Sequence, residues 1–122
     1  MMLEPISGDC RALLSVIGRM RLPLDNEKRL QADMAAHFER EGIAYEREVA
    51  IVGGIIDFRF PFGAGIEVKI GGRARAIYDQ LEGYSAEPSI SHLILATNKA
   101  MALPPRIGGK WCTVVNLGSA WL

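Results

Sequence analysis

The spacing of apolar residues along the chain alternates between helix-like and strand-like patterns. Apolar residues recur every three or four positions over 9–20, between Asp25 and Gly42, and over 74–84, which predicts three amphipathic helices. We expect Asp25 to cap the second helix and Gly42 to end it. Strand-like patterns occupy five further segments, which are 45–52, 55–60, 66–70, 92–97 and 113–115. The predicted order of elements is therefore ααβββαββ.

The connections between the predicted strands indicate how they pair. Gly53 and Gly54 separate the first two strands and suit a two-residue hairpin turn with positive φ. The segment 61–65 is rich in turn-forming residues and short enough to make the second and third strands antiparallel neighbours. The strands over 92–97 and 113–115 do not alternate, as expected of strands buried on both faces. Together these features predict an α/β fold with helices packed on a mixed central sheet.

Charged residues interrupt the second and third predicted strands. Period-two alternation places Asp57 on the face of the second strand opposite the apolar residues, which are Ile56, Phe58 and Phe60. In the third strand, Glu67 and Lys69 share a face, and the opposite face is apolar. Both strands therefore carry charged groups on one face of an otherwise apolar hairpin.

The length of the loop between these strands decides which charged groups meet. With a three-residue loop, Phe60 pairs with Ala64, and Asp57 lies directly opposite Glu67. With a five-residue loop, Asp57 lies opposite Lys69 instead, with Glu67 on the diagonal. The charged residues share a face in either register. Two opposed carboxylates destabilise a sheet unless a cation binds them.

A divalent metal ion fits this set of groups. Asp57, Glu67, the backbone carbonyl of Val68 and several waters would supply the octahedral oxygen coordination of Mg²⁺ or Mn²⁺. Lys69 would lie beside a metal-bound water, where it can orient the nucleophile and offset charge developing on a phosphate. The pattern therefore indicates metal-assisted hydrolysis of a phosphodiester.

The string from Asp57 to Lys69, with nine residues between the two acids and the sequence E-V-K at its end, resembles the core of the PD-(D/E)XK nucleases. Members of that family carry a helical glutamate before the strands, which Glu27 matches. In the RecB-type and archaeal Holliday-junction-resolvase-like branches, a helical Q-x-x-x-Y follows the lysine, and Gln80 and Tyr84 match it. The resemblance covers roughly residues 25–97.

This resemblance implies a restriction-endonuclease-like core with the order αβββαβ. It also implies an Mg²⁺-dependent (or Mn²⁺-dependent) DNA endonuclease, with resolvase-like specificity as one variant and a homodimer as its assembly. The implied catalytic residues are Asp57, Glu67, Lys69, Glu27, Gln80 and Tyr84, and the implied metal ligands are Asp57, Glu67, Val68 and Glu27. Gln80 and Tyr84 would steady the lysine, the acids or a bound phosphate. One departure is Ile56, which stands where the family name has proline.

Other interpretations of the same residues stay open. A non-catalytic subunit that keeps the fold would bind DNA or assemble with partners without cleaving. A different metal-dependent phosphoryl hydrolase would act on RNA or nucleotides. Glu27 is equally explained as a first-turn acid favoured by the helix dipole. Two histidines are expected to be non-catalytic, His37 in solvent and His92 at a strand edge or cap. Trp111, Met101 and Trp121 are expected to pack against the core or a second subunit rather than stack on a base.

The composition limits the classes of protein. The chain has 122 residues, which suits a single domain over 1–122 with a helical extension over 1–24. No apolar stretch approaches the roughly 20 residues of a membrane span, and the start lacks the pattern of a signal peptide, so we expect a cytoplasmic protein. Cys10 and Cys112 have no second ligand at metal-binding spacing and are expected to be inert.

The formal net charge is zero, but the charges are unevenly distributed. The segment from Asp25 to Asp57 carries −4, the segment 58–75 carries +3, and the chain from Pro88 onward also carries +3. We therefore expect two modest basic surfaces around an acidic site, with DNA as the partner and other recombination or replication proteins as further partners. The candidate DNA-binding residues are Gly71, Gly72, Arg73, Arg75, Lys99, Arg106 and Lys110.

Overall fold

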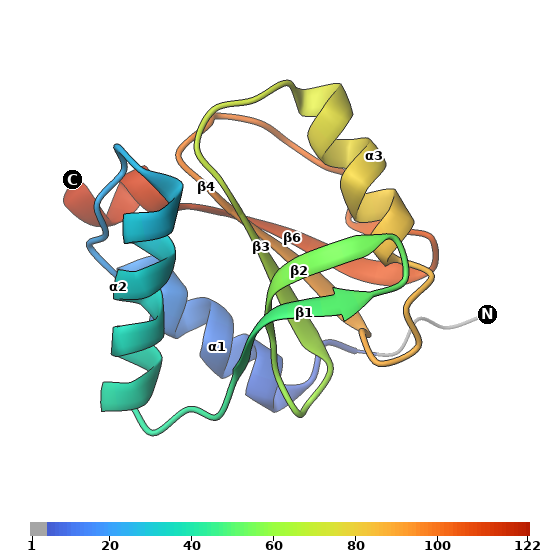
Figure 1. Cartoon of the computed structure of the whole chain (residues 1–122), viewed down its shortest axis with the longest axis horizontal. Helices are drawn as coiled ribbons and strands as arrows, with labels where there is room; N and C mark the ends of the chain where they lie inside the picture. Colours follow the sequence, from blue (N-terminus) through green and yellow to red (C-terminus); the bar gives the residue numbers. More distant parts are fainter. Residues whose placement is uncertain (1–4) are drawn as a thin grey trace.

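The computed structural model describes residues 5–122 and has an α/β architecture with helices on both faces of a mixed sheet (Figure 1). The first four residues of the expected extension over 1–24 lie outside the described residues. The elements are α1 (Gly8–Arg19), α2 (Glu27–Arg40), β1 (Glu46–Ile51), β2 (Gly54–Arg59), β3 (Ala64–Lys69), α3 (Ala74–Tyr84), β4 (His92–Thr97), β5 (Arg106–Ile107), β6 (Lys110–Asn116) and the 3₁₀ helix η1 (Leu117–Trp121).

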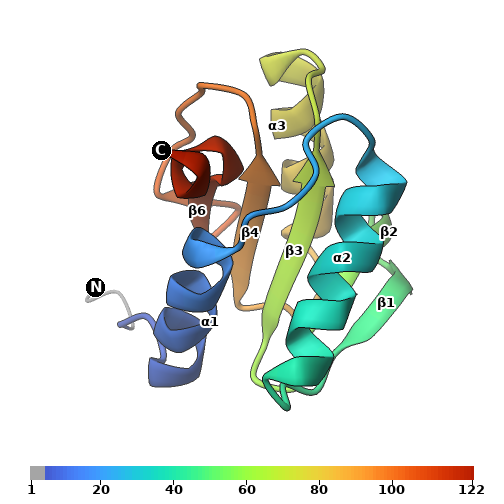
Figure 2. The same ribbon diagram turned by 90° about the vertical axis from the view of Figure 1, so that its left-hand side faces the viewer.

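The six strands lie in the order β1-β2-β3-β4-β6-β5. The pairs β1–β2, β2–β3 and β5–β6 are antiparallel, whereas β3–β4 and β4–β6 are parallel. The mixed sheet expected from the sequence is therefore confirmed. Helices α1 and α2 cover one face of the sheet and α3 covers the other (Figures 1 and 2). No helix within residues 5–122 has the length and apolar character needed to cross a membrane.

The larger core lies between the sheet and the first two helices. Phe38 of α2 is fully buried and meets the rings of Phe58 and Phe60 edge-on, with centroids 5.5 and 5.2 Å apart. Such aromatic pairs contribute about 0.5–1.5 kcal/mol beyond the burial of their area. This packing fixes α2 against β2 and β3, and so fixes the first residue of α2 near the end of β3.

The cap of α2 is one residue later than the sequence pattern predicts. The Asn26 side chain accepts a hydrogen bond from the backbone N–H of Arg29 at 3.0 Å, so Asn26 is the N-cap. Asp25 instead forms an exposed ion pair with the Arg29 side chain at 2.8 Å. Both residue types cap helices well, and the position that adopts extended backbone geometry next to the first turn decides between them. Gly42, with φ of 69°, follows the helix as expected.

The hairpin of β1 and β2 is strongly twisted, and its turn differs from the expected one. Ile51 pairs with Gly54, so the two-residue loop is Val52–Gly53 rather than Gly53–Gly54. Glu48, across from Asp57 between two regular pairs, has a φ of 51°, which is unusual for a residue other than glycine. The hairpin therefore turns sharply at this level, and its tip reaches α3 (Figure 1).

This twist overturns one face assignment. The sequence pattern places Ile56 on the same face as Phe58 and Phe60, but Ile56 packs in the core beneath α3, whereas the two phenylalanines pack beneath α2. Simple period-two alternation assumes a flat strand, and β2 is not flat at Asp57. Asp57 therefore lies at the point in β2 where the buried side chains change from the α3 face of the sheet to the α2 face.

The C-terminal third contains two elements that the sequence pattern does not predict. Strand β5 has two residues, too few to show a period, and it pairs with β6 across Gly108 and Gly109. Strand β6 spans seven residues rather than the expected 113–115, and η1 follows it. The side chain of Asn116 accepts a hydrogen bond from the N–H of Gly118 and so caps η1.

Candidate active site

Asp57 and Glu67 meet because the loop between β2 and β3 is short. Phe58 pairs with Ile66, and Phe60 N–H donates to the Ala64 carbonyl at 2.9 Å, which is the register of a three-residue loop. Continued by one residue, this register sets Asp57 opposite Glu67. Of the two loops that the sequence leaves open, the structure has the shorter one.

The regular ladder between β2 and β3 stops at the aspartate. Asp57 Oδ2 accepts the backbone N–H of Val68 at 2.7 Å, so a side-chain oxygen takes the place of a strand carbonyl. The N–H and C=O of a strand residue point to the same side, so the Val68 carbonyl also faces this interrupted seam. The break in the sheet therefore brings a carboxylate and a backbone oxygen together.

Glu67 is the most constrained acid of the site. It is 3% exposed, and its Oε1 has no hydrogen-bond partner within the described part of the chain. Its Oε2 lies 3.5 Å from Lys69 Nζ. Burial, followed by repulsion from Asp57, raises the pKa of Glu67 to about 8, although Lys69 acts in the opposite direction. A buried, unpaired carboxylate oxygen of this kind is suited to a cation.

The pKa of Asp57 is also raised, first because the carboxyl is partly buried. The hydrogen bond from Val68 N–H and the charge of Lys69 lower the pKa, but they do not offset the burial. Both neighbouring carboxyls therefore have a raised pKa when no cation is bound. A divalent ion would reverse that shift, because it stabilises both ionised forms.

Glu27 reaches the same strand from the first turn of α2. Its Oε1 accepts the backbone N–H of Ile70 at 2.9 Å, and its charge contributes to the raised pKa of Asp57. Among residues 5–122, no three His, Cys, Asp or Glu side chains gather into a group that could hold a metal ion. Glu27 thus lies near Asp57 and Glu67, but its carboxylate accepts a hydrogen bond from the backbone just after β3.

Gln80 and Tyr84 contact each other, one turn apart on α3. Gln80 Nε2 donates to Tyr84 Oη at 2.8 Å, and Tyr84 Oη donates to the Ile55 carbonyl at 2.7 Å. Burial, then the charge of Glu67, raises the pKa of Tyr84 to about 12, so the phenol stays protonated. In this structure the pair holds the β1–β2 hairpin, and neither residue bonds Lys69 or the acids.

The hairpin tip is also held by a close backbone approach. A Cβ on Gly53, where φ is +90°, would lie 2.6 Å from backbone atoms of Gly83 in α3. Only glycine allows this contact. The tyrosine bond and the glycine contact together fix β2, and therefore the carboxylate of Asp57.

Several of the candidate DNA-binding residues lie just beyond β3. Gly71 and Gly72 have positive φ, and the Gly71 N–H donates to the Asn98 side chain at 3.2 Å. Lys99 Nζ donates to the Gly72 carbonyl at 2.8 Å.

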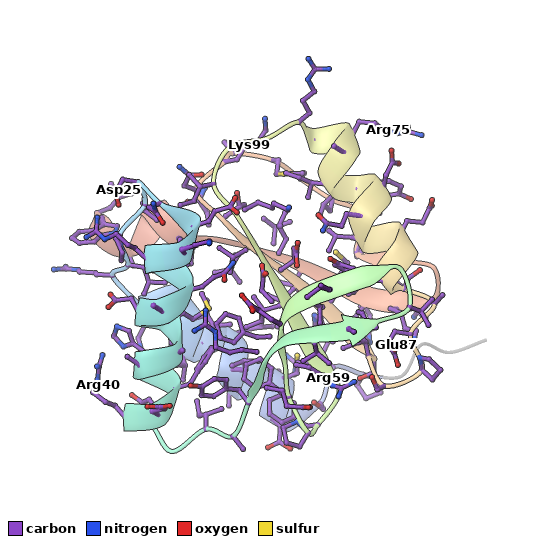
Figure 3. All side chains as sticks on the ribbon, viewed as in Figure 1. Asp25, Arg40, Arg59, Arg75, Glu87 and Lys99 are labelled. Carbon is purple, nitrogen blue, oxygen red and sulfur yellow. The ribbon has the colours of Figure 1, made fainter. Side chains whose placement is uncertain are left out.

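Arg73 is exposed at the start of α3. Arg75 is also exposed and forms an ion pair with Asp79 at 3.2 Å. Lys99 and Arg75 both lie at the end of the molecule where α3 begins (Figure 3).

Arg106 and Lys110 lie at the opposite end of the sheet. Strand β6 runs parallel to β3 and β4, so Asn116 pairs with Thr97 at the end where Lys69 lies, and Lys110 stands at the other end. Lys110 Nζ donates to the carbonyls of Glu87 and Ile90. Arg106 lies over the Trp111 ring, 5.1 Å from its centroid. The structure therefore does not bring these two cations to the acidic pair. The sequence did not predict this, because a strand pattern does not give the direction in which β6 runs.

A buried cysteine–histidine contact escaped the sequence analysis. Cys10 Sγ lies 3.1 Å from His92 Nδ1, and His92 Nε2 lies 2.7 Å from Thr113 Oγ1. Cys10 and His92 are 82 positions apart in the chain, and His92 and Thr113 are 21 positions apart, so no local spacing in the sequence indicates these contacts. Burial raises the pKa of Cys10 to about 11 and lowers that of His92, so both groups are neutral near pH 7. The thiol is protonated and inaccessible, and the contact is structural.

Comparisons of the chain with protein-family models, with curated proteins and with solved structures found no match. The functional proposal therefore rests on the acids, Lys69 and the strands that hold them.

Proposed function

We propose that the protein is a metal-dependent DNA endonuclease with a restriction-endonuclease-like core. The observation that carries this proposal is the carboxylate of Glu67, which is 3% exposed, has an unpartnered Oε1, and lies between Asp57 and the ammonium of Lys69. A purely structural acid at this depth would have its oxygens satisfied by N–H or O–H donors. An acid that binds a cation would keep an oxygen free of such donors, as Glu67 does with Oε1.

The donor set fits Mg²⁺ or Mn²⁺. Both ions prefer oxygen ligands in octahedral geometry and retain several waters, so two carboxylates and one backbone carbonyl suffice. Asp57, Glu67 and the Val68 carbonyl would hold the ion, and Glu27, which accepts the Ile70 N–H, would assist them from α2. When bound, the ion acidifies that water and polarises the phosphate oxygens.

Lys69 supplies the positive charge that the acids lack. Its side chain is 27% exposed, so the ammonium can contact both Glu67 and a substrate at the surface. It orients the attacking water and offsets the charge that develops on the phosphate oxygens during hydrolysis. Gln80 and Tyr84 act indirectly, because they hold the β2 backbone two residues before Asp57.

Cleavage assays with matched variants test this proposal. The wild-type chain is expected to cut DNA with Mg²⁺ or Mn²⁺ and not with EDTA, on a panel of supercoiled plasmid, linear duplex, single strand and four-way junction. Glu67→Gln and Lys69→Ala should each reduce the rate by roughly 10²–10³-fold, the usual cost of losing one group that stabilises the transition state. The control is Glu41→Gln, which removes an exposed acid at the end of α2. Equal metal-dependent rates in all four proteins would refute the proposal.

The same panel separates the alternatives. Binding of DNA without cleavage in either metal would identify a catalytically silent DNA-binding or assembly subunit. Cleavage of RNA or nucleotides but not DNA would identify a different phosphoryl hydrolase. Faster cleavage of the four-way junction than of linear duplex would support the resolvase-like form of the proposal.

Assembly belongs to the resolvase-like form of this proposal. An enzyme of this size that cuts two strands needs a second active site, so we expect a homodimer on DNA, with recombination or replication proteins as its further partners. Sedimentation with and without a four-way junction tests this, and a monomer under both conditions would refute it.

A further inference from the structure

A hollow of 490 Å³ opens between η1, the segment before α2 and the first two turns of α2. It is lined by Arg21, Pro23, Arg29, Ala32, Asp33 and Trp121. Its volume falls in the range of roughly 300–1,000 Å³ that is typical of small-ligand sites. Figure 2 shows η1 and the segment before α2 at the end of the sheet where β3 and β4 finish. The hollow therefore lies at the same end of the molecule as Lys69.

The indole of Trp121 is exposed but held in place. The residue is 53% exposed, yet its Nε1 donates to the Leu22 carbonyl at 3.2 Å. Arg21 Nε donates to the Ala120 carbonyl at 2.9 Å, and the Arg21 guanidinium lies 6.0 Å from the indole centroid. An exposed tryptophan side chain without such contacts rotates between several conformers. The hydrogen bond of the Trp121 indole restricts this rotation, which reduces the entropy lost when a flat ligand binds.

Two guanidinium groups line the hollow. Arg21 lies over the Trp121 ring, and Arg29 comes from the first turn of α2. Arg29 is paired with Asp25, but the two side chains are 64% and 68% exposed. Exposed ion pairs of this kind are worth about 0–1 kcal/mol, so a phosphate can compete for the arginine. Asp33 also lines the hollow and opposes an anion there.

We propose that this hollow binds one unpaired nucleotide of a DNA strand, with its base stacked on Trp121 and its phosphate at Arg21 and Arg29. An aromatic platform beside arginines is the combination that holds single-stranded DNA independently of its sequence. The bases of a duplex have both faces covered by their neighbours, so only an unpaired base can use the indole. The inference rests on the proposed function, because it gives the DNA strand a contact at the end of the sheet where Lys69 lies.

Fluorescence of a single tryptophan tests the proposal. Trp111→Phe leaves Trp121 as the one indole of the chain. This variant is titrated with the oligonucleotide (dT)₁₀, and with a ten-base-pair duplex, in low-salt buffer containing EDTA. Stacking should quench the Trp121 emission with (dT)₁₀ and much less with the duplex. Equal quenching by both, or none by (dT)₁₀, would overturn the proposal.

Affinity changes in further variants provide a second readout. Trp121→Ala should weaken (dT)₁₀ binding by about 5- to 140-fold, the loss expected for one base–aromatic stack. Trp121→Phe keeps an aromatic face and should retain most of the affinity, which separates stacking from damage to the fold. Arg29→Gln should weaken binding, and Asp33→Asn should strengthen it, because the first removes a phosphate partner and the second removes a repulsive charge. Unchanged affinity in Trp121→Ala would refute the stacked base.

Failure of this inference and failure of the nuclease proposal give different results. Quenching in EDTA does not require catalysis, so it can occur in a chain that cleaves nothing. Metal-dependent cleavage that is intact in Trp121→Ala, with no quenching in Trp111→Phe, would refute the hollow alone. Quenching without cleavage of any substrate would refute the nuclease alone.

Discussion

The buried acid of β3 makes the stability of the protein depend on pH in a direction opposite to that of most acids. The pKa of Glu67 is about 8 in the folded protein and 4.5 in an unfolded chain. Between these values the unfolded chain has released a proton that the folded chain still holds, so rising pH favours unfolding. At roughly 1.4 kcal/mol for each pKa unit, the loss approaches about 5 kcal/mol above pH 8. Domains of this size have only about 5–15 kcal/mol in total.

The test compares wild type with Glu67→Gln, which keeps the shape of the side chain and cannot ionise. Urea unfolding in EDTA from pH 5 to pH 9 gives the free energy of unfolding of each protein. We expect similar values at pH 5 and a growing advantage for the variant toward pH 9, because the variant does not bury a charge. Acids that do not interact with Glu67 affect both proteins equally and cancel in the difference, whereas the repulsion between Asp57 and Glu67 is part of the difference.

The same unfolding measurements are repeated with Mg²⁺ in place of EDTA. Mg²⁺ at pH 8–9 should stabilise wild type and leave Glu67→Gln nearly unchanged, since the ion binds only the ionised acid and stabilises the state that it binds. A constant difference between the two free energies of unfolding across the whole pH range would refute the argument that burial raises the pKa of Glu67. The proposed nuclease activity does not enter this measurement.

Two further predictions concern the elements that position the site. Asn26→Ala should lower the free energy of unfolding by about 0.5–2 kcal/mol because it removes the cap of α2, and Asp25→Ala should change it little because its ion pair is exposed; chemical denaturation measures both, and equal effects would contradict the assignment of the cap. Gly53→Ala should cost more than Gly109→Ala, because both have positive φ but only a Cβ on Gly53 collides with the α3 backbone; comparable losses of thermal stability would refute that contact.

Much of the fold could be predicted from the sequence because its signals are local. The helix over 74–84 and the strand over 92–97 match the structure at both ends, since a regular apolar period and flanking turn residues define them. The short segment between β2 and β3 limits Asp57 to a position opposite either Glu67 or Lys69, so the sequence places these charged residues on one face, and the structure shows that Asp57 lies opposite Glu67. The candidate site could therefore be located before its surroundings were known.

The remaining features depend on contacts between distant segments. The twist that moves Ile56 under α3 comes from packing of the hairpin on that helix, which alternation cannot express. The direction of β6 decides that Lys110 lies far from Lys69, and a strand pattern reads the same in both directions. The hollow at Trp121 joins residues 99 positions apart, because Trp121 Nε1 reaches the Leu22 carbonyl. The sequence favours packing of Trp121 over stacking on a base, and it does not show that the residue is 53% exposed in the fold.

The interrupted seam of β3 has a practical use in spectroscopy. Two backbone amides, those of Val68 and Ile70, donate to the carboxylates of Asp57 and Glu27 respectively, instead of to a neighbouring strand. The nitrogen and proton resonances of an amide respond to the charge on the oxygen that it contacts. The two resonances therefore report on two different carboxylates of the unmodified chain, so a single pair of NMR signals can follow the binding of metal and of substrate separately at Asp57 and at Glu27.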